Sequence, residues 1–281
     1  MDIKLICFDL DGTFLDDEKN IPPRNIAALE EAAARGVYIV PSTGRTYMGV
    51  PQAIRELPFA RYFITANGAC IYDAVEDRVL SLATIPLPLA LKFFDYADTL
   101  PVIYDCYKES GGYSNQSMWH LYDEFVPDPA IRKHVVAMRK PVDDLKAYLR
   151  ESGEDLFKMQ MFFTDMDERR RQLEIMPGMF PELAFSSSIP GNVEVNIADG
   201  TKGRAVLKLC KILGLEREQS LAVGDGSNDR DMLIRAGVGV AMGNAVDELK
   251  AVADHVTGHC NDAGFAMAIE ELVLNKPGAS I

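Results

Sequence analysis

Apolar runs that stop abruptly at small polar residues alternate with helical patterns near both ends of the chain. Between the first two runs, Ile26, Leu29 and Ala33 repeat at the spacing of one helix face, and Gly36 supplies a stop signal. Short buried runs that alternate with amphipathic helices indicate βαβ units, and hence a doubly wound, mostly parallel α/β sheet of the Rossmann-like kind. The predicted strands are 4–8, 37–40, 61–65, 220–223, 238–242 and 255–257, and the later helices are 203–213 and about 264–274.

The middle of the chain has a different pattern. Between about residues 86 and 190 it holds most of the aromatic residues, and its strand candidates do not end in small polar residues. We therefore expect an inserted α/β cap domain formed by residues 85–189, and a core domain formed by residues 1–84 and 190–281. The candidates within the insertion are helices over 86–98, 141–151 and 167–176 and strands over 102–104 and 157–163.

The net charge and the cysteines limit the classes of binding partner and the cellular compartment that we expect for this protein. The 281 residues include 29 Lys or Arg and 42 Asp or Glu, a formal net charge of −13, which opposes binding to nucleic acid or to an anionic membrane. The five cysteines are spaced too widely for a zinc finger, and an odd number fits a disulfide framework poorly. With no signal peptide and no spanning apolar run in the sequence, we expect a cytoplasmic protein. An anionic small substrate stays compatible with this charge, because a metal ion or a few cations reverse the field locally.

Acidic residues directly follow two of the predicted strands. Ligands of open α/β sheets bind outside the carboxyl ends of the strands, so these residues are expected to meet in one site. Asp9 and Asp11 can act separately, one as nucleophile or metal ligand and the other as general acid and base. With Asp9, Asp225 and Asp229 make an oxygen site suited to Mg²⁺. The structural alternative is that the first pair is a solvated turn and that Asp229 stabilises the start of a helix.

Cationic and hydroxyl side chains complete the candidate site. Lys202 lies at the start of the helix over 203–213, where the helix dipole disfavours a cation, so charge balance of a phosphoryl group beside the carboxylates is the better reason for it. Thr43, Gly44 and Arg45 follow the second strand and could cradle phosphate oxygens. A surface lysine and an ordinary turn are the alternatives.

Other chemically suggestive residues receive structural interpretations. His255 and His259 stand four apart, but Gly258 interrupts helical continuity and no third ligand lies nearby, so a zinc site is not expected. The cysteines are interpreted as core residues. Several aromatic residues of the insertion could face a substrate but are more often core, namely Tyr104, Tyr107, Tyr113 and Trp119, together with His120.

Four separated motifs occur together in one order, and their combination resembles the haloacid dehalogenase superfamily of phosphohydrolases. Within it the chain looks like the Cof-type sugar-phosphatase group, which has a large α/β cap. Residues 67–69, 253–257 and 261–264 also look like that group. The motifs are Asp9-Leu10-Asp11-Gly12-Thr13, Thr43-Gly44-Arg45, Lys202-Gly203, and Gly224-Asp225-Gly226-Ser227-Asn228-Asp229 followed by Met232-Leu233.

The resemblance implies a Mg²⁺-dependent phosphomonoester hydrolase that acts on small phosphorylated metabolites, in particular sugar phosphates. In that mechanism Asp9 attacks phosphorus to form an aspartyl-phosphate, and Asp11 protonates the leaving group and then deprotonates water. The inserted domain would close over the site and read the leaving group. The implied Mg²⁺ ligands are Asp9, the backbone carbonyl of Asp11 and Asp225, the phosphate-binding residues are Thr43, Gly44, Lys202 and Asn228, and the supporting residues are Arg45, Asn67 and Asp229, the last of which supports the metal shell or orients Lys202.

Two other functions fit the same motifs. A phosphomutase of the phosphomannomutase type would return the phosphoryl group to a sugar, and a non-catalytic protein would sense a sugar phosphate through an inactive site. The intact set of Asp9, Asp11, Lys202 and Asp225 argues against lost chemistry. The expected partner is a small phosphate ester, with neither nucleic acid nor membrane, and the expected assembly is a monomer or a small homo-oligomer.

Overall fold

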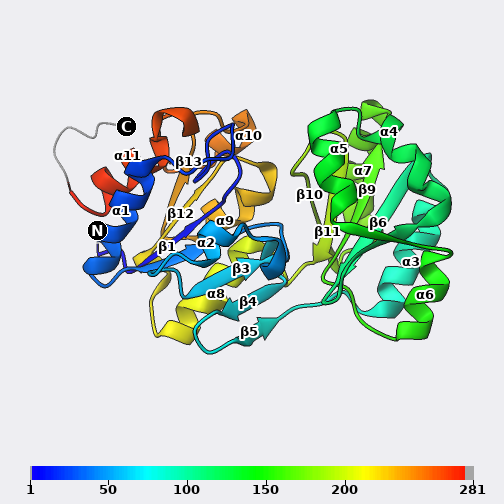
Figure 1. Cartoon of the computed structure of the whole chain (residues 1–281), viewed down its shortest axis with the longest axis horizontal. Helices are drawn as coiled ribbons and strands as arrows, with labels where there is room; N and C mark the ends of the chain where they lie inside the picture. The colour runs from blue at the N-terminus through cyan, green and yellow to red at the C-terminus, as the bar shows by residue number, and fades with distance from the viewer. Residues whose placement is uncertain (1, 276–281) are drawn as a thin grey trace. The chain divides into compact units, whose positions relative to one another are not determined.

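A computed structural model of the chain describes residues 2–275 (Figure 1). These residues divide into two compact units, of which unit 2 is Ala83–Gly200 and unit 1 is formed by the chain before and after it. The first boundary, at 82/83, lies close to the expected one at 84/85, whereas the second lies at 200/201 rather than at 189/190.

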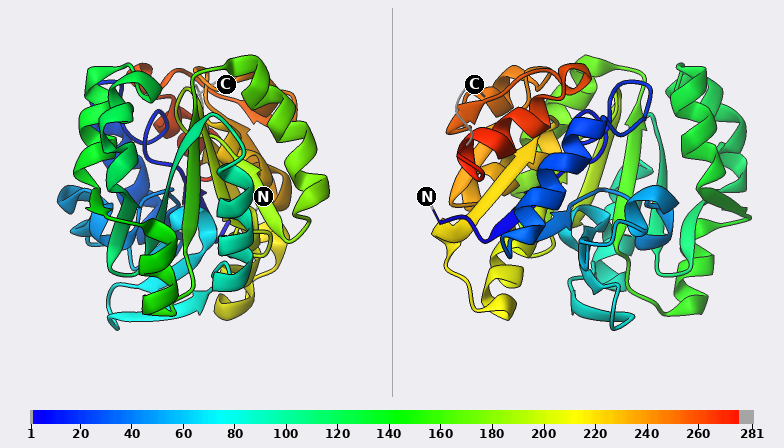
Figure 2. Two further views of the ribbon diagram at one scale, coloured as in Figure 1. Left: turned by 90° about the vertical axis from the view of Figure 1, so that its right-hand side faces the viewer. Right: turned by 60° about the vertical axis from the view of Figure 1, so that its left-hand side comes forward.

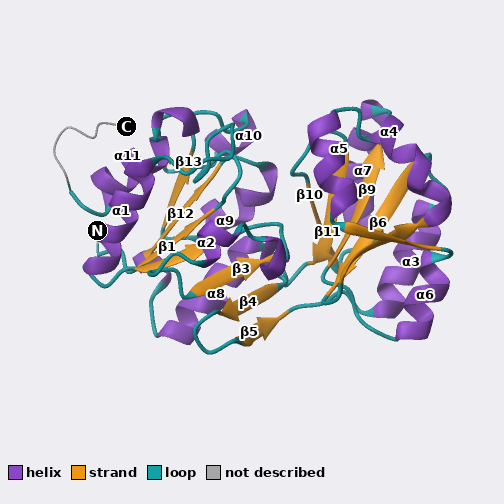
Figure 3. Ribbon diagram, in the orientation of Figure 1, coloured by secondary structure: helices purple, strands orange, loops and turns teal. Residues whose placement is uncertain are grey.

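The main sheet of unit 1 is parallel, as the alternation of strands and helices predicted (Figure 3). Its strands are β1 (Leu5–Phe8), β2 (Tyr38–Pro41), β12 (Ser220–Gly224), β13 (Val238–Ala241) and β14 (His255–Val256), in the spatial order β14-β13-β12-β1-β2. Phe8, at the end of the central strand β1, is in register with Val223 and with Pro41 on the two neighbouring strands. The residues that follow these three strands therefore leave the sheet side by side at one edge.

The strand predicted over 61–65 belongs to that sheet only in part. β3 (Tyr62–Thr65) meets β2 at a single parallel bridge between Ser42 and Ile64, and its full pairing is antiparallel, with β4 (Cys70–Asp73). β4 then pairs with β5 (Arg78–Leu82). The chain reverses through Asn67 and Gly68, whose φ angles of 59° and 102° are left-handed. Such a turn returns the next strand antiparallel, which a helical crossover does not.

Helices of unit 1 cover both faces of its main sheet. They are α1 (Pro23–Ala34), α2 (Gln52–Arg55), α8 (Lys202–Leu213), α9 (Arg230–Arg235), α10 (Asp247–Lys250) and α11 (Gly264–Leu272). α1 packs against α11 on one face, and α8 packs against α9 on the other (Figures 1 and 2). The rings of Phe8, Phe14 and Phe265 lie with centroids 5.0 to 5.3 Å apart. This aromatic cluster anchors the loop after β1 to α11.

Unit 2 is built on a six-stranded sheet of the order β10-β11-β9-β6-β7-β8, which is antiparallel except between β7 and β8. Its strands are β6 (Val102–Lys108), β7 (Gly111–Asn115), β8 (Arg139–Val142), β9 (Lys158–Phe163), β10 (Leu183–Ser186) and β11 (Asn192–Ile197). β11 pairs with both β9 and β10. This pairing places residues 190–200 in unit 2 and moves the second boundary past the expected position.

The helices of unit 2 follow the expected pattern with one correction. They are α3 (Leu87–Ala97), α4 (Tyr122–Phe125), α5 (Pro129–Ala137), α6 (Leu145–Ser152) and α7 (Met166–Met179). The helix predicted over 141–151 begins only at Leu145, because the residues up to Val142 form β8. Asp144 caps that helix, since its carboxylate accepts the N–H of Ala147 at 2.9 Å. The short 3₁₀ helices of the chain are η1 (Tyr47–Gly49), η2 (Ala66–Gly68), η3 (Gln116–Leu121), η4 (Arg217–Gln219), η5 (Ser227–Asp229) and η6 (Cys260–Asp262).

The two faces of the sheet of unit 2 differ in chemistry. Tyr104, Met159 and Val193 lie on one face and belong to an apolar core. Because side chains alternate along a strand, the positions between them lie on the other face, which is largely polar. The buried polar residues of this second face, here called the polar face, are Asp105, Ser114, Arg139, Lys158, Gln160, Asn192, Glu194 and Asn196.

The five cysteines are all buried and carry no disulfide, in agreement with their interpretation as core residues. Cys7, Cys210 and Cys260 belong to the core of unit 1, and Cys106 belongs to that of unit 2. Within residues 2–275, no helix combines the length and the apolar character needed to cross a bilayer.

Candidate active site

Lys202 lies buried between two carboxylates. Its Nζ donates to Asp9 Oδ1 and to Asp229 Oδ1, both at 2.6 Å, and the residue is 1% exposed. Burial acts to lower the pKa of the ammonium group, but the two carboxylates outweigh burial and raise that pKa, so the amine is charged at neutral pH. The cation at the first position of α8 is therefore compensated by Asp9 and Asp229 and not by the helix.

A glycine allows the first turn of α8 to reach the ends of the strands. Gly68 has a φ of 102°, and a Cβ there would lie 2.2 Å from the carbonyl oxygen of Thr201. Any side chain at this position would push Thr201, the N-cap of α8, away from β3. The turn after β3 thereby sets where the amine of Lys202 stands.

Asp225 follows β12 and faces the turn after β1. Its Oδ1 accepts the hydroxyl of Thr13 at 2.7 Å, and a Cβ on Gly12 would lie 2.5 Å from its Oδ2. Burial, followed by repulsion from Asp229, raises the pKa of Asp225 to about 7. Carboxylate oxygens of Asp9, Asp225 and Asp229 lie within 4.8 Å of one another. Two separate strand ends thus contribute to one acidic cluster.

The donor set of this cluster fits a hard divalent cation. Burial raises the pKa of Asp9 well above its usual range, and the charge of Lys202 opposes this shift only in part. Three carboxylates surround one ammonium group, so the cluster keeps an excess of negative charge when its acids are ionised. An ion such as Mg²⁺, which prefers oxygen ligands, would neutralise that excess.

Asp229 has little capacity left to bind a metal ion. Its Oδ1 accepts Lys202 Nζ, and its Oδ2 accepts the backbone N–H groups of Asp225 at 3.1 Å and of Gly226 at 3.0 Å. Of the two roles that the resemblance left open, these contacts favour the orientation of Lys202. Asp229 also holds the loop after β12 in place.

Asp11 is held by two cations. Arg45 Nε and Nη2 donate to the Asp11 carboxylate at 3.2 Å and 2.9 Å, and Lys19 Nζ lies 3.1 Å from Asp11 Oδ1. Burial would raise the pKa of Asp11, but the charges of Arg45 and Lys19 outweigh it and lower the pKa. The Asp11 carboxyl is therefore ionised in this state of the protein.

The residues after β2 form a chain of contacts that ends at the loop after β12. The hydroxyl of buried Thr43 accepts the N–H of Arg45 at 3.2 Å, and the carbonyl of Thr43 accepts the N–H of Asn67 at 3.0 Å. Asn67 Oδ1 would lie 2.9 Å from a Cβ at Gly44, and it accepts Asn228 Nδ2 at 3.4 Å. The expected phosphate-binding residues of these two loops are thereby connected through Asn67.

The structure adds residues that the sequence did not single out. Asn244 Nδ2 donates to the carbonyl of Gly12 at 2.7 Å, and Asn244 follows β13. The rule that residues after parallel strands form the site could have found Asn244, and Thr13 lies inside the first motif. Lys19 carries no sequence signal: it reaches Asp11 only because the loop after β1 folds back, with Lys19 at a φ of 66°.

Comparison with known proteins agrees with the resemblance of the motifs. The family model of haloacid dehalogenase-like hydrolases matches residues 6–269. The chain is 32% identical over 278 residues to 5-amino-6-(5-phospho-D-ribitylamino)uracil phosphatase YcsE of Bacillus subtilis, an alignment that covers 98% of this chain and 97% of that protein.

Two solved structures share the fold over nearly the whole chain. A haloacid dehalogenase-like hydrolase from B. subtilis superimposes with a TM-score of 0.82 at 28% identity, covering 96% of this chain and 100% of the other. The subclass IIB sugar phosphatase BT4131 superimposes with a TM-score of 0.77 at 25% identity, covering 95% and 98%. Because the family match extends from β1 to α11, the chain belongs to the haloacid dehalogenase-like hydrolases, as the four motifs indicated.

Proposed function

We propose that this hydrolase is a Mg²⁺-dependent phosphatase that removes the phosphoryl group from sugar phosphates and related small phosphorylated metabolites through an aspartyl-phosphate. The observation that carries the proposal is the buried amine of Lys202, which bonds Asp9 and Asp229 at 2.6 Å beside the carboxylate of Asp225. The names of the relatives support the substrate class, since one is a phosphatase of a phosphoribityl compound and another is a sugar phosphatase.

The proposed reaction starts at Asp9. Its carboxylate attacks phosphorus in line, the bond to the leaving alcohol breaks, and the phosphoryl group is carried on Asp9 until water releases it. Asp11 acts as the base that takes a proton from this water, and its lowered pKa keeps it ionised for that step. For the earlier step as general acid, Asp11 needs a proton, which the approach of an anionic phosphoryl group to Arg45 and Lys19 would favour by offsetting their charge.

Lys202 is the proposed anchor of the phosphoryl group. An ammonium group has three N–H donors, and two of them are used by Asp9 and Asp229. The third is available to a phosphoryl oxygen, and Thr43, the N–H of Gly44 and Asn228 would bind further oxygens. Asp229 keeps the amine in position between substrate and nucleophile.

Mg²⁺ would be held by the Asp9 carboxylate, the Asp11 backbone carbonyl and Asp225. When bound, it would neutralise charge on the phosphoryl oxygens during transfer. Asp225 is proposed as a ligand because it lies close to Asp9 and, among residues 2–275, its carboxylate accepts a hydrogen bond from Thr13 alone. Both oxygens of Asp229, by contrast, already accept hydrogen bonds.

Asp225→Asn is expected to lower phosphate release by about 10²-fold or more, because it removes a charged oxygen that stabilises the transferring group. Turnover of the unchanged protein should stop on addition of a chelator and return with Mg²⁺, whereas the variant should need a much higher Mg²⁺ concentration. Steady-state phosphate release against Mg²⁺ concentration measures both effects. Asp247→Asn is the matched control, because Asp247 is an exposed aspartate of the same unit. An Asp225→Asn protein with an unchanged Mg²⁺ response would contradict the assignment.

We further propose that unit 2 determines which phosphate ester is turned over. Its polar face is unusual for a buried sheet face, since Arg139 pairs with Asp105 at 2.5 Å and Lys158 pairs with Glu194 at 2.7 Å. Asp105 Oδ1 is buried with no hydrogen-bond partner among the described residues. The ring of Tyr107 lies 5.2 Å from the Arg139 guanidinium. Such fixed donors and acceptors suit a hydroxylated leaving group and not an apolar one.

Tyr107→Phe is expected to raise KM for hydroxylated phosphate esters several-fold and to leave kcat little changed, because a hydrogen bond to the leaving group contributes about 1 kcal/mol. Tyr104→Phe is the matched control: it lies on the same strand but on the opposite face, where its hydroxyl donates to Asp98 at 2.6 Å. A panel of about fifty phosphomonoesters, ranked by kcat/KM, makes the measurement. Equal KM changes in the two variants would count against the polar face as the specificity surface.

A further inference from the structure

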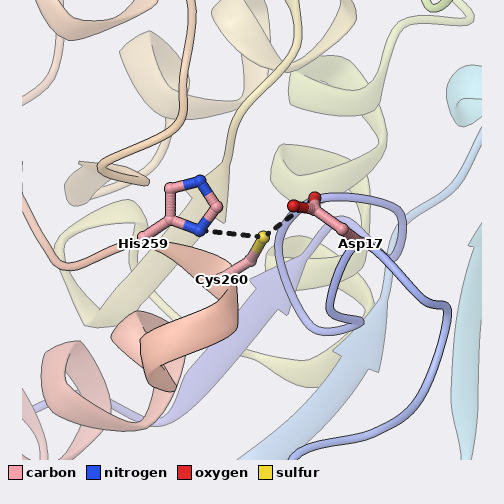
Figure 4. A group of neighbouring side chains, drawn as sticks. All are labelled: Asp17, His259 and Cys260. Atoms are coloured by element: carbon pink, nitrogen blue, oxygen red, sulfur yellow. Dashed lines mark hydrogen bonds between the residues drawn. The ribbon is translucent and has the colours of Figure 1, made fainter.

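Three side chains with different donor atoms meet in unit 1 at a place that the proposed reaction does not use. Asp17 lies in the loop after β1, and His259 and Cys260 lie at the start of η6 (Figure 4). One oxygen, one nitrogen and one sulfur atom from these residues lie within 4.8 Å of one another. The pair His255 and His259, considered from the sequence, is replaced here by a set that only the fold brings together.

The distances around the sulfur match those of a tetrahedral metal site. Cys260 Sγ lies 3.6 Å from His259 Nδ1, 3.7 Å from Asp17 Oδ1 and 3.7 Å from Asn261 Oδ1. When a tetrahedral ion binds sulfur at about 2.3 Å and nitrogen or oxygen at about 2.0–2.1 Å, those ligand atoms stand about 3.5–3.6 Å from the sulfur. Each of the three other atoms therefore stands from the sulfur at about the separation expected between two ligands of one tetrahedral ion.

Hydrogen bonds hold these donors in the form that binds a metal. His259 Nδ1 accepts the N–H of Asn261 at 3.1 Å, so this nitrogen is unprotonated and the ring proton lies on Nε2; a metal ion would take over the Nδ1 lone pair from this hydrogen bond. Asn261 Nδ2 donates to Asp17 Oδ2 at 2.8 Å, and the N–H of Asp17 donates to Asn261 Oδ1 at 3.1 Å. This reciprocal pair orients Asp17 and its amide partner, as outer contacts do in metal sites.

The surroundings of Cys260 differ from those of an ordinary core cysteine. Its residue is fully buried, yet its sulfur faces a carboxylate, an imidazole and an amide. The thiol must give up its proton to bind a cation, because the thiolate is the metal ligand. A cation that prefers sulfur would displace this proton into the solvent and neutralise both acidic groups.

We propose that Asp17, His259, Cys260 and Asn261 form a binding site for Zn²⁺ or a similar thiophilic divalent cation, separate from the oxygen-only cluster of Asp9, Asp225 and Asp229. A mixed sulfur, nitrogen and oxygen set is the kind that selects zinc over magnesium. The site is also tied to the catalytic loop. Asn244 accepts the N–H of Cys260 at 2.9 Å and donates to the carbonyl of Gly12 at 2.7 Å. Zn²⁺ bound here would connect the loop after β1 to η6, because both segments would supply ligands, and it would raise the melting temperature.

Titration of the metal-free protein with Co²⁺ tests this site directly. Tetrahedral Co²⁺ bound to a thiolate shows a sulfur-to-metal charge-transfer band, which an oxygen-only site does not give. We expect the band to saturate at one Co²⁺ ion per chain and to disappear when Zn²⁺ is added, because Zn²⁺ displaces Co²⁺. The band should persist in Asp9→Asn, which disables the proposed catalytic site, so failure of this inference is distinguishable from failure of the proposed function. Absence of the band in the unchanged protein overturns the proposal.

Substitutions assign the ligands. Cys260→Ser should abolish the band, while Cys210→Ser, which changes another buried cysteine of unit 1, should keep it. His259→Gln and Asp17→Asn should each weaken Co²⁺ binding by at least tenfold, and these less buried positions give the test even if Cys260→Ser does not fold. A band that survives in Cys260→Ser, or affinities unchanged in both His259→Gln and Asp17→Asn, would refute the site.

Discussion

Asp9→Asn is expected to fold normally and to lose at least about 10³-fold in phosphate release, which is the scale of effect seen when a nucleophile is removed. The amide keeps the shape of the carboxylate but cannot carry the phosphoryl group. Stability should be retained or slightly improved, because burial, followed by repulsion from Asp229 and Asp225, raises the pKa of Asp9, and a neutral amide avoids both costs. Lys202 keeps its bond to Asp229 in the variant.

Two measurements separate loss of the nucleophile from a general defect. Rapid quenching of the unchanged protein with labelled substrate should trap phosphate on the chain in a form that hydroxylamine releases, and Asp9→Asn should trap none. Thermal unfolding should show that both proteins melt within a few degrees of each other. Retention of even a tenth of the turnover by Asp9→Asn would remove Asp9 from its proposed role.

Lys202→Met is expected to lower turnover by about 10²–10³-fold, as when a donor to transition-state charge is lost, and also to destabilise the protein. Removal of one partner of a buried ion pair leaves an uncompensated charge and costs about 3–5 kcal/mol. The 1% exposure of Lys202 and its two carboxylate partners place it in that class. A stability loss alone therefore does not establish a catalytic role.

The double variant Lys202→Met/Asp229→Asn separates the two roles. It removes one positive and one negative charge, so much of the lost stability should return, while the missing amine leaves turnover low. Urea unfolding and phosphate release are measured on four proteins: the unchanged protein, Lys202→Met, Asp229→Asn and the double variant. These measurements give the stability and the turnover of each protein. Recovery of turnover together with stability would show that Lys202 is only a structural ion-pair partner.

The pH dependence of stability offers an independent check on Lys202. The folded pKa of this amine is raised above its unfolded value, so its contribution is fully present below the unfolded pKa, near 10.4, and is lost as pH rises toward the folded value. Above about pH 10 the unchanged protein should thus lose stability that Lys202→Met never had. The difference between the two proteins in urea unfolding should narrow over that range.

Much of the candidate site could be predicted from the sequence because its residues sit at strand ends. The runs that became β1, β2 and β12 are largely apolar, and their ends are marked by the small polar residues that follow. Parallel strands in register then bring Asp9, Thr43 and Asp225 to one edge. Lys202 was placed by a different argument, since a cation at a helix start requires a partner outside the helix.

Other features depended on contacts that no local pattern encodes. The reversal at Asn67 and Gly68 pairs β3 with an antiparallel neighbour, and the pairing of β11 with β9 and β10 moved a domain boundary. Lys19 reached Asp11 through the path of a loop.

The order of buried and exposed positions along this chain determined the parallel sheet, the helices around it and the acidic and cationic residues at its edge, because hydrophobic burial and turn chemistry act over short stretches. Which side chains bond to which was decided only in the folded molecule. The bond of Lys202 to Asp229, the ion pair of Arg45 with Asp11 and the contact of Asp17 with Cys260 all join residues distant in sequence. Their distances follow from packing of whole elements, and neighbouring residues carry no record of them.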